Sequence, residues 1–266
     1  MNLKIKGWQK YMEIINYLTP ANVVTYLLLF VRISSFLAFM PFFNYTAIPM
    51  KVKAAFAFWL SVLLFPTTPK FVYEINVSTV LLSVLNEVAF AFFVGTALQM
   101  VFDILKYAGE QISFVMGFTL ANVMDPNAGV QTTIVSEFLT WIAVLMFLSI
   151  GGDHLEILFL NKTLSMLPFG EFFNYKNVYE YFVVYMGKYF LLGITMAFPI
   201  IAISLMGDII FGMIMKTMPQ FNLLVVGFPI KITIAFMVLI AIFSSLMHNF
   251  STEVLKVFDS LMKFIG

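Results

Sequence analysis

The sequence predicts an all-α membrane protein with about six hydrophobic segments arranged as broken helical hairpins. Of its 266 residues, 61% are hydrophobic and 11% are charged, whereas about a quarter of the residues in soluble domains are charged. The apolar residues form long runs, several of them interrupted by proline, glycine or a single charge. Because hydrocarbon offers the backbone no hydrogen-bond partner, we expect these runs to be helices.

The N-terminal part is expected to place one helix on the membrane surface and the next one across it. Residues 1 to 20 mix lysine and aromatic residues with apolar ones, which is typical of an amphipathic helix at the interface. The first long apolar run extends from Val23 to Met40 and contains Arg32. A charge inside such a run is costly and usually faces protein. We therefore interpret Arg32 either as a contact with another subunit or as an internal counter-charge.

The next two segments differ in length. Lys51 and Lys53, which follow Pro49, predict a short basic turn ahead of the uncharged run Ala54 to Phe65. A full crossing needs about 20 helical residues, so this run is expected to be tilted, re-entrant or packed away from lipid. The run Val77 to Phe102 is long enough to cross.

The stretch from Gly109 to Pro126 is expected to organise the rest of the chain. Between Glu110 and Asp125 it has no charge, yet its amide, hydroxyl and glycine residues make it too polar and too broken for a lipid-facing helix. Such backbone is tolerated at membrane depth where protein or a water-filled cavity surrounds it. The stretch therefore predicts a pore lining or a seam between subunits.

The second half contains further apolar segments. Phe138 to Gly152 is uncharged, and Tyr189 to Gly207 is the strongest spanning candidate, closed by Asp208. The C-terminal part predicts a helical hairpin with the arms Ile209 to Met218 and Ile232 to Met247. A charged amphipathic tail is expected after the second arm.

Neither enzymatic activity nor a bound metal or other cofactor is predicted. The chain has no cysteine and two histidines, which excludes disulfides, thiolate catalysis and cysteine-based metal sites. His154 follows Asp153, but adjacent residues on a helix are expected to point in different directions. The segment GEQISFVMG lacks the spacing and the lysine of a phosphate-binding loop. A net charge of +1 gives no indication of nucleic-acid binding.

Several charged residues in or beside apolar segments are candidates for transport chemistry. They are Arg32, Glu87, Asp103, Glu110, Asp125, Glu137 and Asp208. A proton-coupled carrier would place one or two carboxylates near the middle of the membrane, whereas most of these residues sit at segment ends. The positions favour solvated or paired charges over proton coupling.

Phe114, Met116 and Phe118 support two interpretations. Bulky apolar side chains can close a pore by expelling water, and methionine adapts to what passes through. The same residues would serve equally well in plain core packing, so the residues alone leave both interpretations open.

Four motifs together resemble the FliR family, whose members are subunits of the flagellar type III export gate, with counterparts in injectisomes. The motifs are the proline-and-lysine segment from Pro41 to Pro66, the AGEQISFVMGF run within residues 108–126, GGDHL at 151–155, and PQFNLLVVGFPIKI at 219–232. Their order and spacing cover nearly the whole chain.

The resemblance implies an architecture, a gate and a set of partners. Residues 1–185 are expected to form a FliP-like helical region with a plug loop near 109–126, and residues 186–266 a FliQ-like hairpin. The implied gate residues are Phe114, Met116, Gly117 and Phe118. Residues assigned to subunit contact or structure are Arg32, Glu87, Asp125, Pro126, Pro219, Gln220, Asn222, Gly227 and Pro229. The implied partners are FliP-like and FliQ-like membrane subunits in one helical hetero-oligomeric export-gate complex, FlhB-like and FlhA-like export proteins, unfolded secreted polypeptides and membrane lipid.

The implied function is that of a core subunit of the flagellar export gate, in the bacterial inner membrane at the flagellar basal body. It would form part of the channel through which unfolded flagellar proteins are secreted. The alternatives are the equivalent subunit of a virulence injectisome and a stand-alone secondary transporter or channel. A carrier would act alone and depend on one carboxylate, whereas a gate would depend on partner subunits and tolerate most charge neutralisations.

Overall fold

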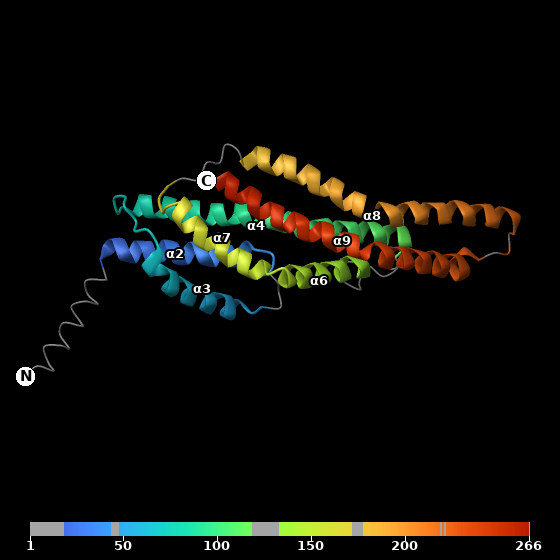
Figure 1. The fold of residues 1–266 in the computed structure, drawn as a ribbon, viewed down its shortest axis with the longest axis horizontal. Helices are drawn as coiled ribbons and strands as arrows, with labels where there is room; N and C mark the ends of the chain where they lie inside the picture. The colour runs from blue at the N-terminus through green and yellow to red at the C-terminus, as the bar shows by residue number, and fades with distance from the viewer. Residues whose placement is uncertain are drawn as a thin grey trace, which may run out of the picture. The chain divides into compact units, whose positions relative to one another are not determined.

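The structure is a computed structural model that describes residues 19–43, 48–118, 133–171, 178–218, 220 and 222–265. Every regular element in these ranges is helical, as Figure 1 shows, so the predicted all-α fold class is confirmed. The surface helix predicted over residues 1 to 20 lies almost wholly outside the described residues.

The helices group into two compact units. Unit 1 comprises Met1–Leu98, Asp153–Val178 and Phe258–Gly266, and unit 2 comprises Gln99–Gly152 and Tyr179–Val257. The long helices α4 (Val77–Met116) and α9 (Phe228–Ile265) each contribute residues to both units. Because each unit is assembled from separate parts of the chain, the predicted division near residue 185 stays a prediction.

The first helix of unit 1 among the described residues is α2 (Pro20–Phe39), which corresponds to the predicted run Val23 to Met40. The Thr19 hydroxyl accepts a hydrogen bond from the Asn22 amide at 3.3 Å and so caps the first turn. Pro20 occupies the first helical position, where its missing amide needs no partner. The local sequence therefore determines where this helix starts.

Helix α3 (Met50–Leu64) starts earlier than the sequence predicts. Lys51 and Lys53 lie in its first turn rather than in a preceding turn, and the chain continues into the short 3-10 helix η1 (Phe65–Thr67). Together α3 and η1 cover 18 residues and form a candidate membrane span, so the predicted twelve-residue run is too short. Lysines are tolerated at a helix end because their long stems carry the charge to the interface.

The core of unit 1 is built on phenylalanine. The Phe36 ring of α2 lies 5.6 Å from the Phe90 ring of α4 and 6.3 Å from the Phe159 ring of helix α7 (Gly152–Met166). All three side chains are at most 1% exposed. Aromatic pairs at these separations attract each other beyond the effect of burial alone. The core therefore joins three helices that are distant in sequence.

Helix α4 is longer than predicted, because it continues past Phe102 through the polar interval to Met116. Gly109 does not break it. A side chain at Gly109 would place its first carbon 2.5 Å from the Cα of Ser136 on helix α6 (Ile134–Ser149), so glycine allows these two helices of unit 2 to approach. This glycine therefore serves close packing, whereas Gly117, the glycine inside the predicted broken stretch, follows the last residue of the helix.

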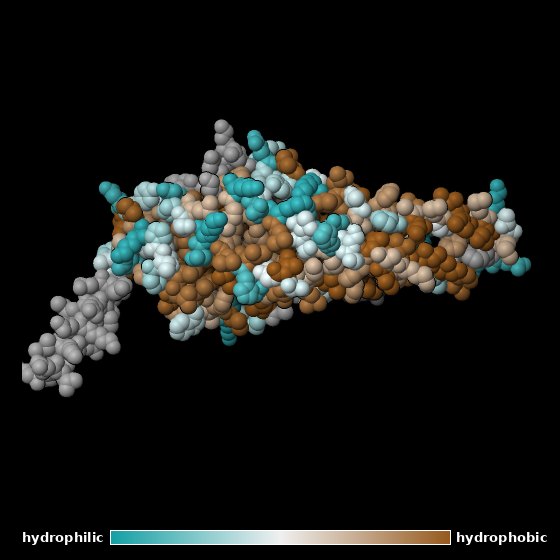
Figure 2. Space-filling model, in the orientation of Figure 1, coloured by the Kyte–Doolittle hydropathy of each residue, from teal (hydrophilic) through white to brown (hydrophobic). Residues whose placement is uncertain are grey.

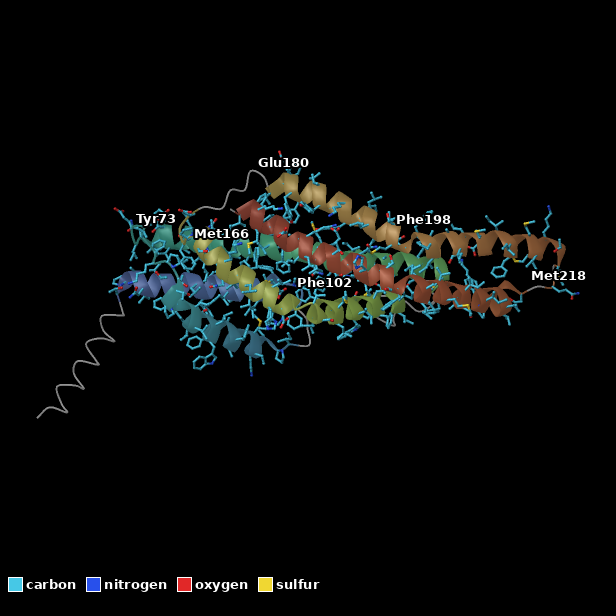
Figure 3. The ribbon with its side chains drawn as sticks, viewed as in Figure 1. Tyr73, Phe102, Met166, Glu180, Phe198 and Met218 are labelled. Carbon is cyan, nitrogen blue, oxygen red and sulfur yellow. The ribbon has the colours of Figure 1, made fainter. Side chains whose placement is uncertain are left out.

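Helix α8 (Val178–Thr217) and the unit 2 part of α9 form an antiparallel hairpin (Figure 1). The sequence predicts a C-terminal hairpin with shorter arms and with Asp208 closing the preceding span. In the structure, α8 continues through Asp208, because Lys231 of α9 pairs with its carboxylate at 2.7 Å. Figure 3 shows Phe198 where α8 changes direction, next to Pro199, whose ring and missing amide bend a helix.

The chain is a membrane protein. Among the described residues, five helices are long and apolar enough to span a bilayer, and a sixth crossing results if α6 and α7 are counted as one broken span. On the hairpin of unit 2, Figure 2 shows hydrophobic side chains over both arms and hydrophilic ones at the tip. Exposed apolar residues there include Met206, Ile209, Met213, Met237 and Ile240. Such a face suits lipid or other helices rather than water.

Candidate functional site

The predicted plug region begins at the end of helix α4, where Gly117 terminates the helix. Its φ of +87° lies in the left-handed region that favours glycine. The Gly117 amide donates to the Phe114 carbonyl at 3.1 Å, and the Phe118 amide donates to the Ser113 carbonyl at 3.1 Å. These two bonds make a Schellman motif, which satisfies the last carbonyls of a helix. The chain direction at the start of the plug is therefore set by local hydrogen bonds.

The predicted gate side chains do not face one direction. Met116 is fully buried in unit 2, whereas Phe114 is 66% exposed. Phe118 is half-buried, and its ring lies 6.4 Å from the ring of Phe236 on α9. Within this chain Met116 therefore serves core packing, while Phe114 presents a large apolar ring on the outside. The assignment of these residues to a gate stays a prediction.

The motif at 219–232 forms the tip of the hairpin and the start of α9. A five-residue π-helix, η4 (Leu223–Gly227), precedes Phe228. Asn222 supports this turn, because its carbonyl accepts from the Val226 amide at 3.0 Å and its side-chain oxygen accepts from the Val225 amide at 3.3 Å. Short π-helical turns are rare and occur often at functional sites.

The other predicted contact residues are distributed along this motif and beyond it. Gln220 is exposed, Gly227 is buried at the end of η4, and Pro229 is the second residue of α9, where proline is tolerated. Asp125, Pro126 and Pro219 lie outside the described residues.

Arg32 and Glu87 form an ion pair inside unit 1, and both side chains are fully buried. The guanidinium binds the carboxylate through two hydrogen bonds, Nε to Oε2 at 2.5 Å and Nη2 to Oε1 at 2.8 Å. It also donates to the backbone carbonyls of Thr163 at 3.1 Å and Leu167 at 2.9 Å. The planar guanidinium lies 4.6 Å from the Phe169 ring centroid. One arginine therefore connects α2, α4 and the end of α7.

The carbonyls of Thr163 and Leu167 lie at the C-terminal end of α7, where the helix dipole is negative, and the Thr163 carbonyl also accepts the Leu167 amide at 2.9 Å. A cation there is stabilised by the dipole, and the guanidinium gives each of the two carbonyls a hydrogen-bond donor. A buried ion pair is stable only when its remaining hydrogen-bonding groups are also satisfied, and this arrangement provides that. Of the two interpretations of Arg32, the internal counter-charge fits this geometry.

The hairpin of unit 2 carries two further sets of paired charges. Lys231 is 10% exposed and donates to both oxygens of Asp208, whose side chain is 53% exposed. Nearer the open end of the hairpin, Lys188 and Lys256 donate to the two oxygens of Glu253 at 2.5 and 2.9 Å. Both sets join charges that an apolar helix could not carry alone.

Asp153 and His154 do interact, because Nδ1 of the histidine lies 3.0 Å from Oδ1 of the aspartate. The expectation that these adjacent side chains point apart is wrong here, because both lie in the first turn of α7 and can turn toward each other. The histidine side chain is 82% exposed, so the contact is a solvated one and contributes little.

Glu156 on α7 is a buried residue that the sequence analysis did not single out. Its side chain is 1% exposed, and both carboxylate oxygens lack a hydrogen-bond partner among the described residues. Its spacing was the available signal, because Phe159 and Leu160, three and four residues on, are also buried on the same face. In the described ranges, no group of three histidine or acidic side chains is placed to hold a metal ion.

Comparison with known proteins gives consistent matches over nearly the whole chain. The family model of the bacterial export proteins, family 1, matches residues 23–257. The flagellar biosynthetic protein FliR of Bacillus subtilis (strain 168) is 30% identical, covering 91% of this chain and 95% of its own length. The protein of the same name from Aquifex aeolicus (strain VF5) is 31% identical, with 89% and 93% covered. That of Escherichia coli (strain K12) is 23% identical, with 79% and 81% covered.

Proposed function

This chain belongs to family 1 of the bacterial export proteins, as the FliR resemblance of its motifs predicts, and from this premise we propose that it is a membrane subunit of the flagellar export gate. The observation that carries the proposal is the length of the match. It runs from residue 23 to residue 257 and includes all four motifs, so it takes in helices of both units.

The distribution of exposed side chains supports assembly with other membrane subunits. In the most apolar 18-residue windows of α8 and α9, 28% and 22% of the residues are buried inside the chain. Extensive apolar helix surface of this kind is expected where helices from neighbouring subunits or lipid complete the packing. We expect FliP-like and FliQ-like subunits as neighbours in the inner membrane at the basal body, with FlhB-like and FlhA-like proteins beside them.

We assign the end of α4 and the stretch after it to the plug of this gate. A fixed helix end carrying the exposed ring of Phe114 suits an apolar constriction that excludes water from a closed channel. The chain would then position polypeptides and close the pore without catalysing a reaction.

The paired charges favour the gate over a stand-alone carrier. A carrier needs a carboxylate that can exchange its partner, whereas the Glu87 carboxylate is bound by Arg32 in a buried site that also uses two backbone carbonyls. A flagellar rather than an injectisome role is preferred because the three relatives described above carry flagellar names.

The test of assembly is the native mass of the tagged protein after gentle detergent extraction from its own cells, with the co-purifying chains identified. We expect one large complex containing several copies of two small hydrophobic proteins. Recovery as a monomer or homodimer across several mild detergents would contradict the proposal and support a carrier.

The test of the plug is the triple variant Phe114→Ala, Met116→Ala, Phe118→Ala. Because small side chains leave a hydrated gap, the assembled complex is expected to leak ions across the membrane. Ion permeability of cells or vesicles containing the complex is the measurement, with co-purification of the partners as the control for assembly. Unchanged permeability in an assembled variant counts against the plug.

A further inference from the structure

We propose that Phe228 is the positioning residue of the gate, a latch whose ring holds the end of helix α4 and the start of the plug in place. This inference rests on the proposed gate function but uses contacts within unit 2 alone. It connects Gly117 and Phe228, which belong to two different motifs and lie 111 positions apart in the sequence.

The first observation is that the Phe228 ring occupies the space where any residue but glycine would put its side chain at position 117. A Cβ on Gly117 would lie 2.5 Å from Cε1 and 3.1 Å from Cδ1 of that ring. Carbon atoms in contact prefer about 3.5–4.0 Å. Glycine is therefore required at position 117 for two reasons: its φ is positive, and the Phe228 ring leaves no room for a side chain.

The second observation is that the next residue of the plug region contacts the same helix. The Phe118 ring packs edge-on against the ring of Phe236, at 6.4 Å between centroids. Phe228 and Phe236 are eight residues apart, so they lie on one face of α9, about two turns from each other. The last residues of the Schellman motif therefore rest on a single face of α9.

The third observation concerns the chain immediately before Phe228. The π-helix η4 ends at Gly227, and Phe228 is the first residue of α9. A π-turn contains one residue more than an α-turn, and each residue adds about 100° of rotation around the helix. Conversion of η4 to α-helical geometry would therefore rotate Phe228, and α9 with it, relative to the chain that precedes η4. Phe228 thus lies directly after the π-helical turn η4, where the backbone changes to α-helical geometry.

These observations predict that loss of the ring frees the end of α4. The variant Phe228→Ala is expected to raise the ion permeability of the assembled complex severalfold while partner subunits still co-purify. The matched control is Phe243→Ala, a half-buried phenylalanine on the same helix and in the same unit. We expect the control to leave permeability at the wild-type level.

The geometry also predicts that positions 117 and 228 are coupled. Gly117→Ala places a methyl group in the space that the Phe228 ring occupies, and it also strains the backbone at a positive φ. Phe228→Ala removes the clash between the methyl group and the ring but leaves the backbone strain. The thermal midpoint of the Gly117→Ala, Phe228→Ala double variant should therefore fall by less than the sum of the two single shifts. If Phe228→Ala does not assemble, Phe228→Leu, which keeps apolar volume but lacks the ring, replaces it in both measurements.

The outcomes separate the latch from the gate. Additive shifts in the thermal midpoint would overturn the contact itself. Suppose that the thermal shifts are coupled but Phe228→Ala has normal ion permeability. If the triple plug variant leaks ions, this result would overturn the latch. If the triple plug variant also has normal ion permeability, it would overturn the gate. An equal leak in Phe228→Ala and Phe243→Ala would show a general loosening of α9 and would likewise overturn the latch.

Discussion

Two ion pairs between apolar helices, one in each unit, differ in how far the chain itself encloses them. Arg32 and Glu87 in unit 1 are both fully buried, and the guanidinium also binds two carbonyls. In unit 2, Lys231 is nearly buried but its partner Asp208 is 53% exposed. If one member is lost, the other member of the first pair stays enclosed and unpaired, whereas Asp208 is open to groups outside the chain. Similar pairing distances, 2.5 and 2.7 Å, therefore do not imply equal importance.

Removal of the Arg32 charge is expected to have the largest effect. Arg32→Met leaves Glu87 as an uncompensated buried charge and should destabilise the protein by about 3–5 kcal/mol. The thermal midpoint in mild detergent and the amount of protein in the membrane are the measurements. Replacement of both residues by Met should restore much of the stability, because the buried charge is removed with its partner. A single variant as stable as the wild type would show that the pair is dispensable.

Glu156→Gln is the matched control for Glu87→Gln, because both glutamates are buried in unit 1. Glu87→Gln leaves the Arg32 guanidinium without its counter-charge, whereas the Glu156 carboxylate has no hydrogen-bond partner among the described residues to lose. We expect a large loss of stability in the first variant and none in the second. Equal losses would indicate that the effect comes from burial rather than pairing.

Lys231→Met is expected to have an intermediate effect. The half-exposed Asp208 carboxylate is open to groups outside the chain, and the methionine fills the buried part of the lysine stem. The expected loss of stability is about 1 kcal/mol, between values typical of exposed and of buried pairs. A fall in thermal midpoint as large as that of Arg32→Met would mean that Asp208 is enclosed by neighbours in the assembled complex.

Lys263→Met is expected to have the smallest effect. Lys263 and Asp259 are 3.9 Å apart, and their side chains are 81% and 80% exposed. An exposed pair on one helix is screened by water and salt, so the thermal midpoint should not change measurably. A clear drop would indicate that this end of α9 is covered in the complex.

Much of the fold follows from the sequence, because apolar runs longer than a bilayer crossing can only be helices. The helices extend past two predicted boundaries, each of which lies at a charged residue. Asp208 and Lys53 lie inside helices because a paired or end-placed charge is tolerated, and the pairing of Asp208 with Lys231 depends on tertiary structure.

The site was predictable in part. The end of α4 could be located from Gly117, because a glycine after an apolar helix is a common terminator. Its contact with Phe228 could not, because nothing in either motif indicates that two segments so far apart meet. Arg32 was recognised as anomalous, and its two possible roles could be separated only by the position of Glu87 and of the carbonyls that end α7.

The Arg32 site also has a consequence for the order in which the protein is made. The partners of Arg32 follow it by 55, 131 and 135 residues. Because the chain is synthesised from its N-terminus, Glu87 and then the two carbonyls at the end of α7 become available only after the arginine. Closing such long loops carries an entropic cost that the later contacts must repay. Unit 1 therefore cannot reach its final packing until its last part, Phe258–Gly266, has been translated, and the charge of Arg32 is unmatched until Glu87 has joined it.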